Sequence, residues 1–150
     1  MGARFSPAKP PVLLFVGDDY DWAYMFCQEF QKSAPHWHII RARDGWSAML
    51  QLAKGSVPEA LVIDVSRKGV GCRDLIEWVK DQAIFRALPV VVYSGIDDPS
   101  HRKHCTALGV SSYLDKPTSP EELTNHIQTI ARLTQASCTF AQDETALSGV

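Results

Sequence analysis

Short apolar runs alternate with helical stripes along most of the chain. Five runs are rich in Val, Ile, Leu or aromatic residues and are bounded by Gly, Asp, Pro or Ser. This is the pattern expected of buried strands. We predict strands at residues 12–16, 37–42, 60–63, 89–93 and 111–114.

Apolar residues recur at helical spacing between these runs. Trp22, Phe26 and Phe30 predict a first helix that ends near residue 35. A second stripe over residues 46–53 ends at a glycine, and we assign its large side chains, Trp46 and Leu50, to the core. Two further stripes cover residues 75–83 and, more weakly, 100–108.

The last predicted helix has a clear beginning. Ser119 can cap it, the following proline suits its first turn, and two glutamates complement the helix dipole. Leu123, Ile127 and Ile130 then face the core. Strands that alternate with helices require right-handed crossovers and a parallel sheet covered on both faces. The sequence therefore predicts a doubly wound α/β sandwich of three layers.

The 150 residues fit one domain. Residues 1–10 and 135–150 lack clear periodicity, so we interpret the first as a flexible N-terminal tail and the second as a C-terminal tail around a domain of residues 11–134. Four widely separated cysteines without a C-x-x-C pair indicate reduced thiols.

The net charge of −2 gives no general field for binding nucleic acid or an anionic membrane. The longest apolar run, residues 11–16, is far shorter than the roughly 20 residues that span a bilayer, and residues 1–10 lack the core of a signal peptide. We therefore expect a cytoplasmic protein that makes no direct contact with nucleic acid or membrane.

Polar residues follow the predicted strands where ligands bind in open parallel sheets. Asp18 and Asp19 end the first strand, Asp64 the third and Ser94 the fourth, and Lys116 follows the fifth. Crowded carboxylates repel one another unless a cation compensates, and oxygen ligands favour Mg²⁺, with Mn²⁺ as an alternative. A lysine and a hydroxyl beside that cation suit a phosphoryl-sized anion, with Asp64 as the nucleophile.

In this setting the sequence resembles the receiver domain of bacterial response regulators, in a chemotaxis-type, flavodoxin-like fold. The resemblance covers about residues 11–133 and includes the acidic pair in FVGDD, Asp64 in ALVIDVS, Ser94 in PVVVYSG and Lys116 in SSYLDKP. It implies a five-stranded parallel sheet in the order 2-1-3-4-5. It also implies a role in two-component signalling rather than an enzyme, since such a domain assists only its own phosphorylation and dephosphorylation.

The resemblance assigns a role to each residue of the acidic site. Asp64 would accept a phosphoryl group from a histidine kinase or a histidine phosphotransfer protein and become an aspartyl phosphate. Asp18 and Asp19 would hold Mg²⁺ together with Asp64, and the backbone carbonyl of Ser66 would be a further ligand.

The remaining matches concern the response to phosphorylation. Ser94 and Lys116 would contact the phosphoryl oxygens, and Tyr113 matches an aromatic switch residue that moves as Ser94 is drawn toward the phosphate. Movement of this kind would alter the surface of the fourth helix, fifth strand and fifth helix, where we place the contact with a downstream protein.

The sequence departs from the family at the loop after the acceptor, which reads VSRKGVGCRD. Cys72 stands where the family has a glycine, which bears on partner contact more than on chemistry. Ile96, two residues after Ser94, cannot orient an attacking water, so we hypothesise a long-lived phosphoryl group.

Other interpretations stay open. Asp18 and Asp19 could cap the first helix, and Tyr113 could be ordinary sheet packing. The whole chain could be a docking module that works without phosphorylation. It could also be an aspartate-nucleophile phosphohydrolase, although that class needs a second Asp two residues after the nucleophile, where this chain has Ser66.

His101, His104 and Cys105 share one face of the fourth predicted helix. Three potential ligands without a fourth argue against a structural zinc site. We interpret them as solvated helix residues.

Overall fold

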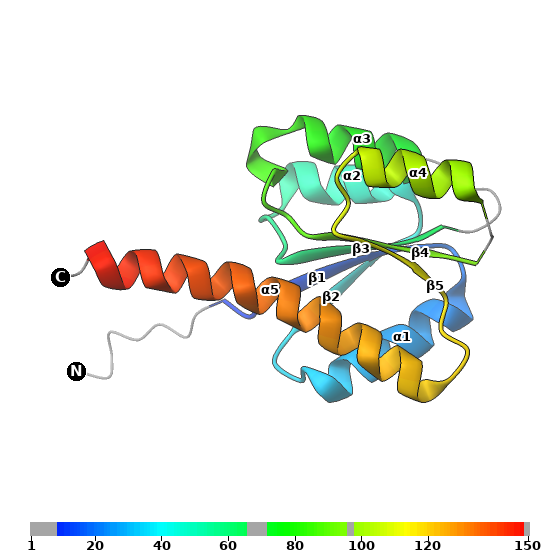
Figure 1. Ribbon diagram of the computed structural model, residues 1–150, viewed down its shortest axis with the longest axis horizontal. Coiled ribbons are helices and arrows are strands. Elements are labelled where there is room, and N and C mark those ends of the chain that lie inside the picture. Colours follow the sequence, from blue (N-terminus) through cyan, green and yellow to red (C-terminus); the bar gives the residue numbers. More distant parts are fainter. Residues whose placement is uncertain (1–8, 66–71, 96–97, 149–150) are drawn as a thin grey trace.

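The computed structural model describes residues 9–65, 72–95 and 98–148, with side chains as far as residue 134. Strands and helices alternate through this part of the chain (Figure 1). The elements are β1 (Val12–Val16), α1 (Tyr20–Ser33), β2 (His38–Ala42), α2 (Gly45–Lys54), β3 (Ala60–Val65), α3 (Cys72–Asp81), the short 3₁₀ helix η2 (Ala83–Phe85), β4 (Val90–Ser94), α4 (Pro99–Ala107), β5 (Ser112–Asp115) and α5 (Pro120–Ser148).

The five strands form one parallel sheet in the order β2-β1-β3-β4-β5. Helices α2, α3 and α4 cover one face of the sheet, and α1 and α5 cover the other (Figure 1). This confirms the predicted doubly wound fold and its strand order. The observed strand bounds differ from the predicted ones by one or two residues at some ends, the usual uncertainty of element boundaries.

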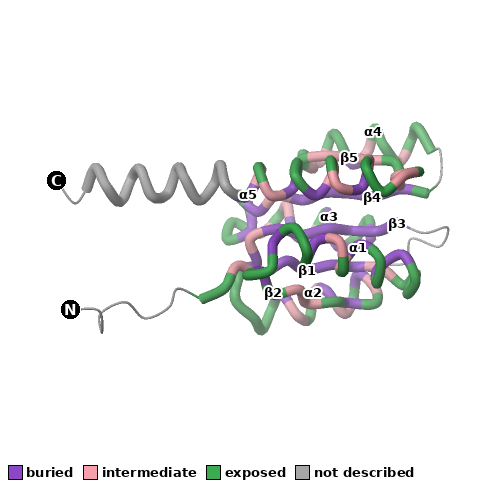
Figure 2. The backbone as a smooth tube through the Cα atoms, turned by 90° about the horizontal axis from the view of Figure 1, so that it is seen from below, coloured by how far each residue is buried: buried purple, intermediate pink, exposed green. Residues whose placement is uncertain are grey.

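One apolar core lies on each side of the sheet, and the buried residues follow the central strands (Figure 2). All residues of β3 and β4 are buried, as expected for strands covered on both faces. On the face of α1 and α5 the core is aromatic: Phe26 and Tyr93 have ring centroids 5.8 Å apart, and Trp22 lies 5.3 Å from Tyr93. Leu123, Ile127 and Ile130 of α5 pack against it, as predicted.

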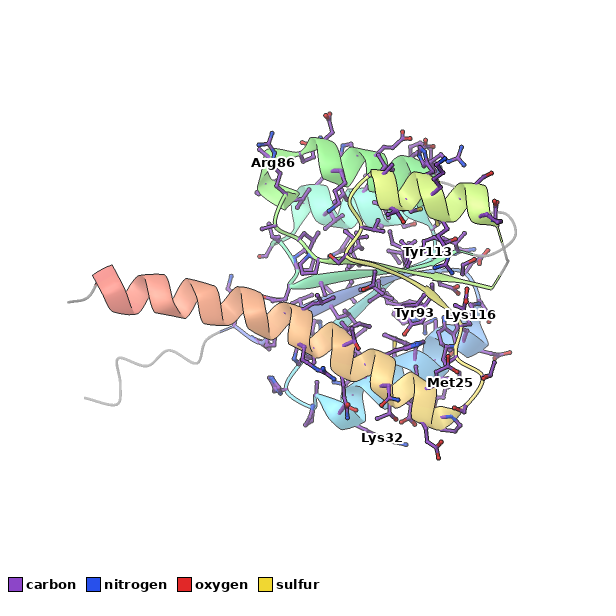
Figure 3. All side chains as sticks on the ribbon, viewed as in Figure 1. Met25, Lys32, Arg86, Tyr93, Tyr113 and Lys116 are labelled. Atoms are coloured by element: carbon purple, nitrogen blue, oxygen red, sulfur yellow. The ribbon has the colours of Figure 1, made fainter. Side chains whose placement is uncertain are left out.

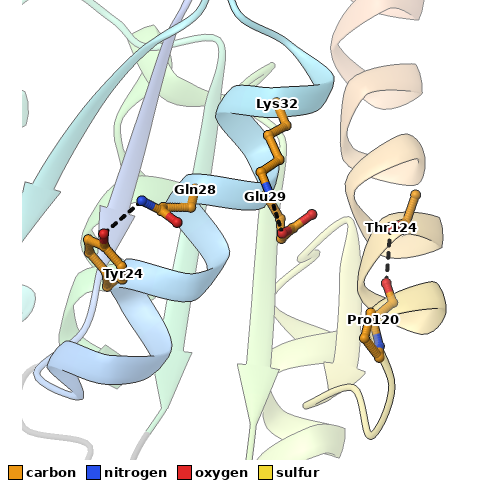
Figure 4. Close-up of polar contacts among 6 residues, drawn as sticks. All are labelled: Tyr24, Gln28, Glu29, Lys32, Pro120 and Thr124. Carbon is orange, nitrogen blue, oxygen red and sulfur yellow. Dashed lines mark hydrogen bonds and ion pairs between the residues drawn. The ribbon is translucent and has the colours of Figure 1, made fainter.

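The solvent-facing sides of α1 and α5 carry local polar contacts (Figure 4). Gln28 Nε2 donates to Tyr24 Oη at 2.7 Å, and Lys32 Nζ forms an ion pair with Glu29 Oε1 at 3.1 Å. Such i,i+3 and i,i+4 pairs stabilise a helix only slightly. At the start of α5, Ser119 Oγ accepts from the backbone N–H of Glu122 at 3.2 Å, so the predicted serine cap is confirmed.

The predicted core stripe of α2 is wrong. Trp46 is 54% exposed and Leu50 is 67% exposed, whereas Gly45, Ala48 and Leu52 are the buried residues of this helix. The buried stripe is thus displaced by about one position from the bulky side chains. Hydrophobic size alone chose the wrong face of the helix.

Helix α5 continues to Ser148, through residues that the sequence indicated only as a weakly patterned tail. The tail boundaries themselves stay predictions. Among the described residues, Cys27, Cys72 and Cys105 form no disulfide. Within the described residues, no helix has the length and apolar character needed to cross a membrane.

Candidate functional site

The phosphoacceptor candidate, Asp64, is the penultimate residue of β3 and is only 2% exposed. It follows four apolar residues that are completely buried, so the strand carries its carboxylate into the protein rather than into solvent. A charged group in this position requires a partner or a shifted pKa.

Lys116 supplies that partner from just beyond β5. Its Nζ lies 3.1 Å from Asp64 Oδ1 and 3.7 Å from Asp19 Oδ2, so one ammonium links two carboxylates from different strand ends. The same Nζ lies 5.4 Å from the ring centroid of Trp22, within the range of a cation–π contact. Figure 3 shows Lys116 just beyond the end of β5.

Burial raises the pKa of the Asp64 carboxyl above its ordinary value. Lys116 opposes this shift through its charge, while the charges of Asp19 and Asp18 add to it. Asp64 Oδ2 accepts no hydrogen bond from any described residue. The site therefore holds one buried carboxylate oxygen that an added cation or electrophile could satisfy.

Asp19 combines the two roles that the sequence left as alternatives. Its Oδ1 accepts from the backbone N–H of Trp22 at 3.1 Å and caps α1, while its Oδ2 faces Lys116. The neighbouring Asp18 is exposed, and its charge acts on Asp64. Helix capping and membership of the acidic site are therefore compatible for Asp19.

Ser94 is the last residue of β4 and is 4% exposed. Its backbone carbonyl accepts from the N–H of Lys116 at 3.1 Å, which fixes β5 and the lysine beside the end of β4. In the sheet register Ser94 pairs with Val65, the neighbour of Asp64. Ser94 thus lies at the same edge of the sheet as Asp64 and Lys116.

Tyr113 lies on β5 and packs against the core under α2, α3 and α4, opposite to Tyr93 (Figure 3). Its hydroxyl lies 2.7 Å from Nδ1 of His101 on α4. Burial raises the pKa of the Tyr113 hydroxyl, and a hydrogen bond with Ser94 opposes that shift. Tyr113 therefore contacts both the site and α4.

The interpretation of His101 and Cys105 as solvated residues is wrong. Cys105 is 1% exposed, His101 is half-buried against Tyr113, and the Cys105 sulfur lies 3.7 Å from His101 Nε2. His104 instead lies 3.2 Å from Glu77 on α3. The structure thus divides the three residues between different neighbours.

Gly17 is a residue of the site that sequence reasoning missed. A Cβ atom at this position would lie 2.9 Å from Asp64 Cβ and 3.3 Å from Asp64 Oδ2. The distance to Asp64 Cβ is shorter than real Cβ atoms show, so a side chain at residue 17 would force the two strand ends to shift. The available signal was the glycine between a buried strand and an acidic pair, where close backbone approach is a common reason for glycine.

Cys72 opens α3 near the acidic residues and is 5% exposed. Burial, together with the charges of Asp64 and Asp18, raises the pKa of its thiol to about 12. The thiol is therefore protonated at neutral pH and a poor nucleophile.

The donor set at this edge is chemically suited to a hard divalent cation. Asp18, Asp19 and Asp64 offer carboxylate oxygens, and the free Oδ2 of Asp64 needs a partner. Among the described side chains, however, no three Asp, Glu, His or Cys residues gather around one point as metal ligands. A cation would draw the three carboxylates together against the ion pairs that Asp19 and Asp64 now make with Lys116.

Several predicted features lie outside the described residues. They are the Ser66 carbonyl, residues 66–71 of the loop after Asp64, and Ile96. Their roles stay predictions.

Comparison with known proteins identifies relatives of this arrangement. Residues 13–128 match the family model of the response regulator receiver domain. The chain is 28% identical over 134 residues to the probable methanogenesis regulatory protein FilR2 of Methanothrix harundinacea, covering 86% of each chain. Several other relatives are longer, and the chain spans between 8% and 51% of the length of six of them.

Solved structures share the fold. A putative response regulator from Chloroflexus aurantiacus J-10-fl is 30% identical with a TM-score of 0.69, over 81% of this chain and 98% of that one. The Mn²⁺-bound form of response regulator Rcp1 is 23% identical with a TM-score of 0.71, over 81% of this chain and 91% of that one. With its sheet order and the match over residues 13–128, this chain belongs to the response regulator receiver domain family.

Proposed function

We propose that the chain accepts a phosphoryl group on Asp64 from a phosphohistidine donor and passes the signal on through protein contacts. The observation that carries the proposal is the pair formed by buried Asp64 and Lys116, with Nζ 3.1 Å from Oδ1 and with Oδ2 accepting no hydrogen bond from the described residues. A buried carboxylate that keeps one oxygen unsatisfied is suited to attack an electrophile.

The chain's own residues would perform separate parts of the transfer. An oxygen of Asp64 forms a bond to phosphorus while the P–N bond of the donor histidine breaks and its electron pair stays on the nitrogen. Lys116 offsets the charge on the phosphoryl oxygens, and the Ser94 hydroxyl donates to one of them. Asp18, Asp19 and Asp64, with the Ser66 carbonyl, would hold Mg²⁺ or Mn²⁺, which neutralises negative charge during the transfer.

The donor would be a histidine kinase or a histidine phosphotransfer protein, which the chain would meet in the cytoplasm. The receiver of the signal would be a downstream protein that contacts the surface of α4, β5 and α5. Tyr113 supports this assignment because it lies on β5 between Ser94 and α4. The long phosphoryl lifetime proposed from Ile96 belongs to the same hypothesis.

The test is intact mass spectrometry after incubation with acetyl phosphate and MgCl₂. We expect the mass of one phosphoryl group to be added to the wild type and no addition to Asp64→Asn. Asp81→Asn, which changes an exposed carboxylate at the end of α3, is the matched control and should behave as wild type.

Two results would contradict the proposal. The absence of any adduct on the wild type would favour a docking module that works without phosphorylation. Repeated release of phosphate from unrelated esters would favour a phosphohydrolase.

A further inference from the structure

His101 and Tyr113 form a contact between α4 and β5 that the proposed chemistry does not yet use. Nδ1 of His101 lies 2.7 Å from the Tyr113 hydroxyl, and the ring centroids are 5.6 Å apart. Arg102 of α4 also contacts the ring and the backbone of Tyr113. Its guanidinium lies 4.6 Å from the ring centroid, and its Nη1 donates to the Tyr113 carbonyl at 3.3 Å. The position of the tyrosine ring is thus set by α4.

The Tyr113 hydroxyl also contacts Ser94, at the edge of the sheet where Asp64 lies. Tyr113 pairs with Val92 in the sheet and Asp115 pairs with Ser94, so Tyr113 and Ser94 lie on the same sheet face, two positions apart. Burial raises the pKa of the Tyr113 hydroxyl, and a hydrogen bond between this hydroxyl and Ser94 acts in the opposite direction. His101, Tyr113 and Ser94 therefore form a chain of polar groups from α4 to the site.

The direction of the hydrogen bonds in this chain depends on His101. A neutral imidazole that carries its proton on Nε2 accepts at Nδ1, whereas an imidazolium can only donate. When Nδ1 accepts, Tyr113 gives its single proton to His101, and its oxygen is left to accept from Ser94. When Nδ1 donates, the tyrosine proton is free for Ser94 Oγ, and the Ser94 proton is free for a phosphoryl oxygen.

We propose that His101 is a positioning residue for phosphoryl transfer, whose imidazolium form orients the Tyr113 and Ser94 hydroxyls so that Ser94 donates to the phosphoryl group on Asp64. This inference rests on the proposed function. By linkage, a phosphoryl group at Asp64 must in turn favour the imidazolium form of His101.

The groups around His101 set the starting point of this equilibrium. Burial is the largest influence and, with the charges of Arg73 on α3 and His104 on α4, lowers the pKa of His101, while Asp98 at the start of α4 opposes them. The remaining polar neighbours in the described structure are Cys105 and Tyr113. The ring is therefore mainly neutral at pH 7, and phosphorylation of Asp64 can raise the pKa of His101.

The first test follows the imidazole signals of the full chain by NMR during a pH titration, with and without beryllium fluoride and MgCl₂ as the phosphoryl mimic. We expect the pKa of His101 to rise when the mimic binds, and this rise to be absent in Tyr113→Phe. His126, whose Nδ1 lies 3.1 Å from the Tyr93 hydroxyl on the other side of the sheet, is the internal control. Its imidazole signals should not respond to the mimic.

The second test measures the rate of adduct formation with acetyl phosphate between pH 5.5 and 8, as the ratio of wild type to His101→Gln. The ratio cancels the titration of Asp64 and of the donor. We expect it to increase by about fivefold toward low pH, the lower end of the coupling between linked sites. His38→Gln removes an exposed histidine from β2, away from α4, and should give a ratio independent of pH.

The outcomes separate this inference from the proposed function. An adduct on Asp64 combined with an unshifted His101 and a flat ratio would overturn the role of His101 alone. A wild type that forms no adduct and binds no beryllium fluoride would overturn the proposed function and this inference together.

Discussion

Gly17 and Asp64 lie so close together that only a glycine fits at position 17, because a Cβ atom there would lie 2.9 Å from Asp64 Cβ. The two residues belong to the ends of neighbouring strands, β1 and β3. The contact lies beside the Asp64 carboxylate, whose Oδ1 is 3.1 Å from Lys116 Nζ. It also provides a way to displace the acceptor without changing its chemistry.

We predict that Gly17→Ala displaces Asp64 and slows phosphorylation by acetyl phosphate more than tenfold. The same crowding should lower the free energy of unfolding by about 1 to 3 kcal/mol, as is usual for overpacked sites. Gly95→Ala is the control, because a Cβ there would meet Lys116 Cδ at an ordinary 3.6 Å. Equal phosphorylation rates in both variants, measured by intact mass, would show that the contact does not position the acceptor.

We predict that Asp64→Asn is more stable than the wild type at neutral pH. Burial raises the pKa of Asp64 in the folded state, so its contribution to stability is complete below its unfolded pKa and is lost as the pH rises through the folded pKa. The stability advantage of the variant should therefore grow from pH 4 to pH 7. Urea unfolding across this range measures it, and an advantage that shrinks with rising pH would contradict the sign.

Divalent cations should stabilise the wild type by binding the three carboxylates. At a Mg²⁺ concentration of 100 times Kd, the expected gain in unfolding free energy is about 2.7 kcal/mol. Asp64→Asn and Asp18→Asn should lose most of this gain, since each removes one of the proposed ligands. Thermal unfolding with Mg²⁺, compared with the same ionic strength of NaCl, separates specific binding from screening of the acidic residues.

Leu50 and Leu52 on α2 should respond very differently to the same truncation. Leu52 is 4% exposed, so Leu52→Ala should cost about 2 to 5 kcal/mol of stability. Leu50 is 67% exposed, so Leu50→Ala should change stability by no more than about 0.5 kcal/mol. Both variants replace Leu by Ala within α2, so the change in helix propensity is the same. Urea unfolding compares their free energies of unfolding directly.

Cys72 should be nearly inert to iodoacetamide in the folded protein at pH 8. Its thiol is buried, and its pKa is about 12, so the reactive thiolate is scarce. Cys27 is half-buried on α1 and should react faster, although burial also raises its pKa. Peptide mapping after timed alkylation gives both rates, and rapid labelling of Cys72 would indicate that α3 opens readily near the site.

The amino-acid sequence by itself determined the order of strands and helices and the edge where the chemistry gathers. Alternating apolar runs and helical stripes specify a parallel sheet, and in such a sheet residues that follow strands share one edge. Asp64, Ser94 and Lys116 could be assigned to that edge because each follows an apolar run in the chain. The strand order came from the resemblance to receiver domains and was confirmed by the sheet.

Only the tertiary structure decided which side chains meet. Periodicity gives the faces of a helix, but in α2 the buried residues are Ala48 and Leu52, and Trp46 is 54% exposed. The fit of Gly17 against Asp64 and the contact of His101 with Tyr113 depend on the distance between separate elements. Those distances are set by sheet register and by packing across the whole domain, and no local pattern in the chain encodes them.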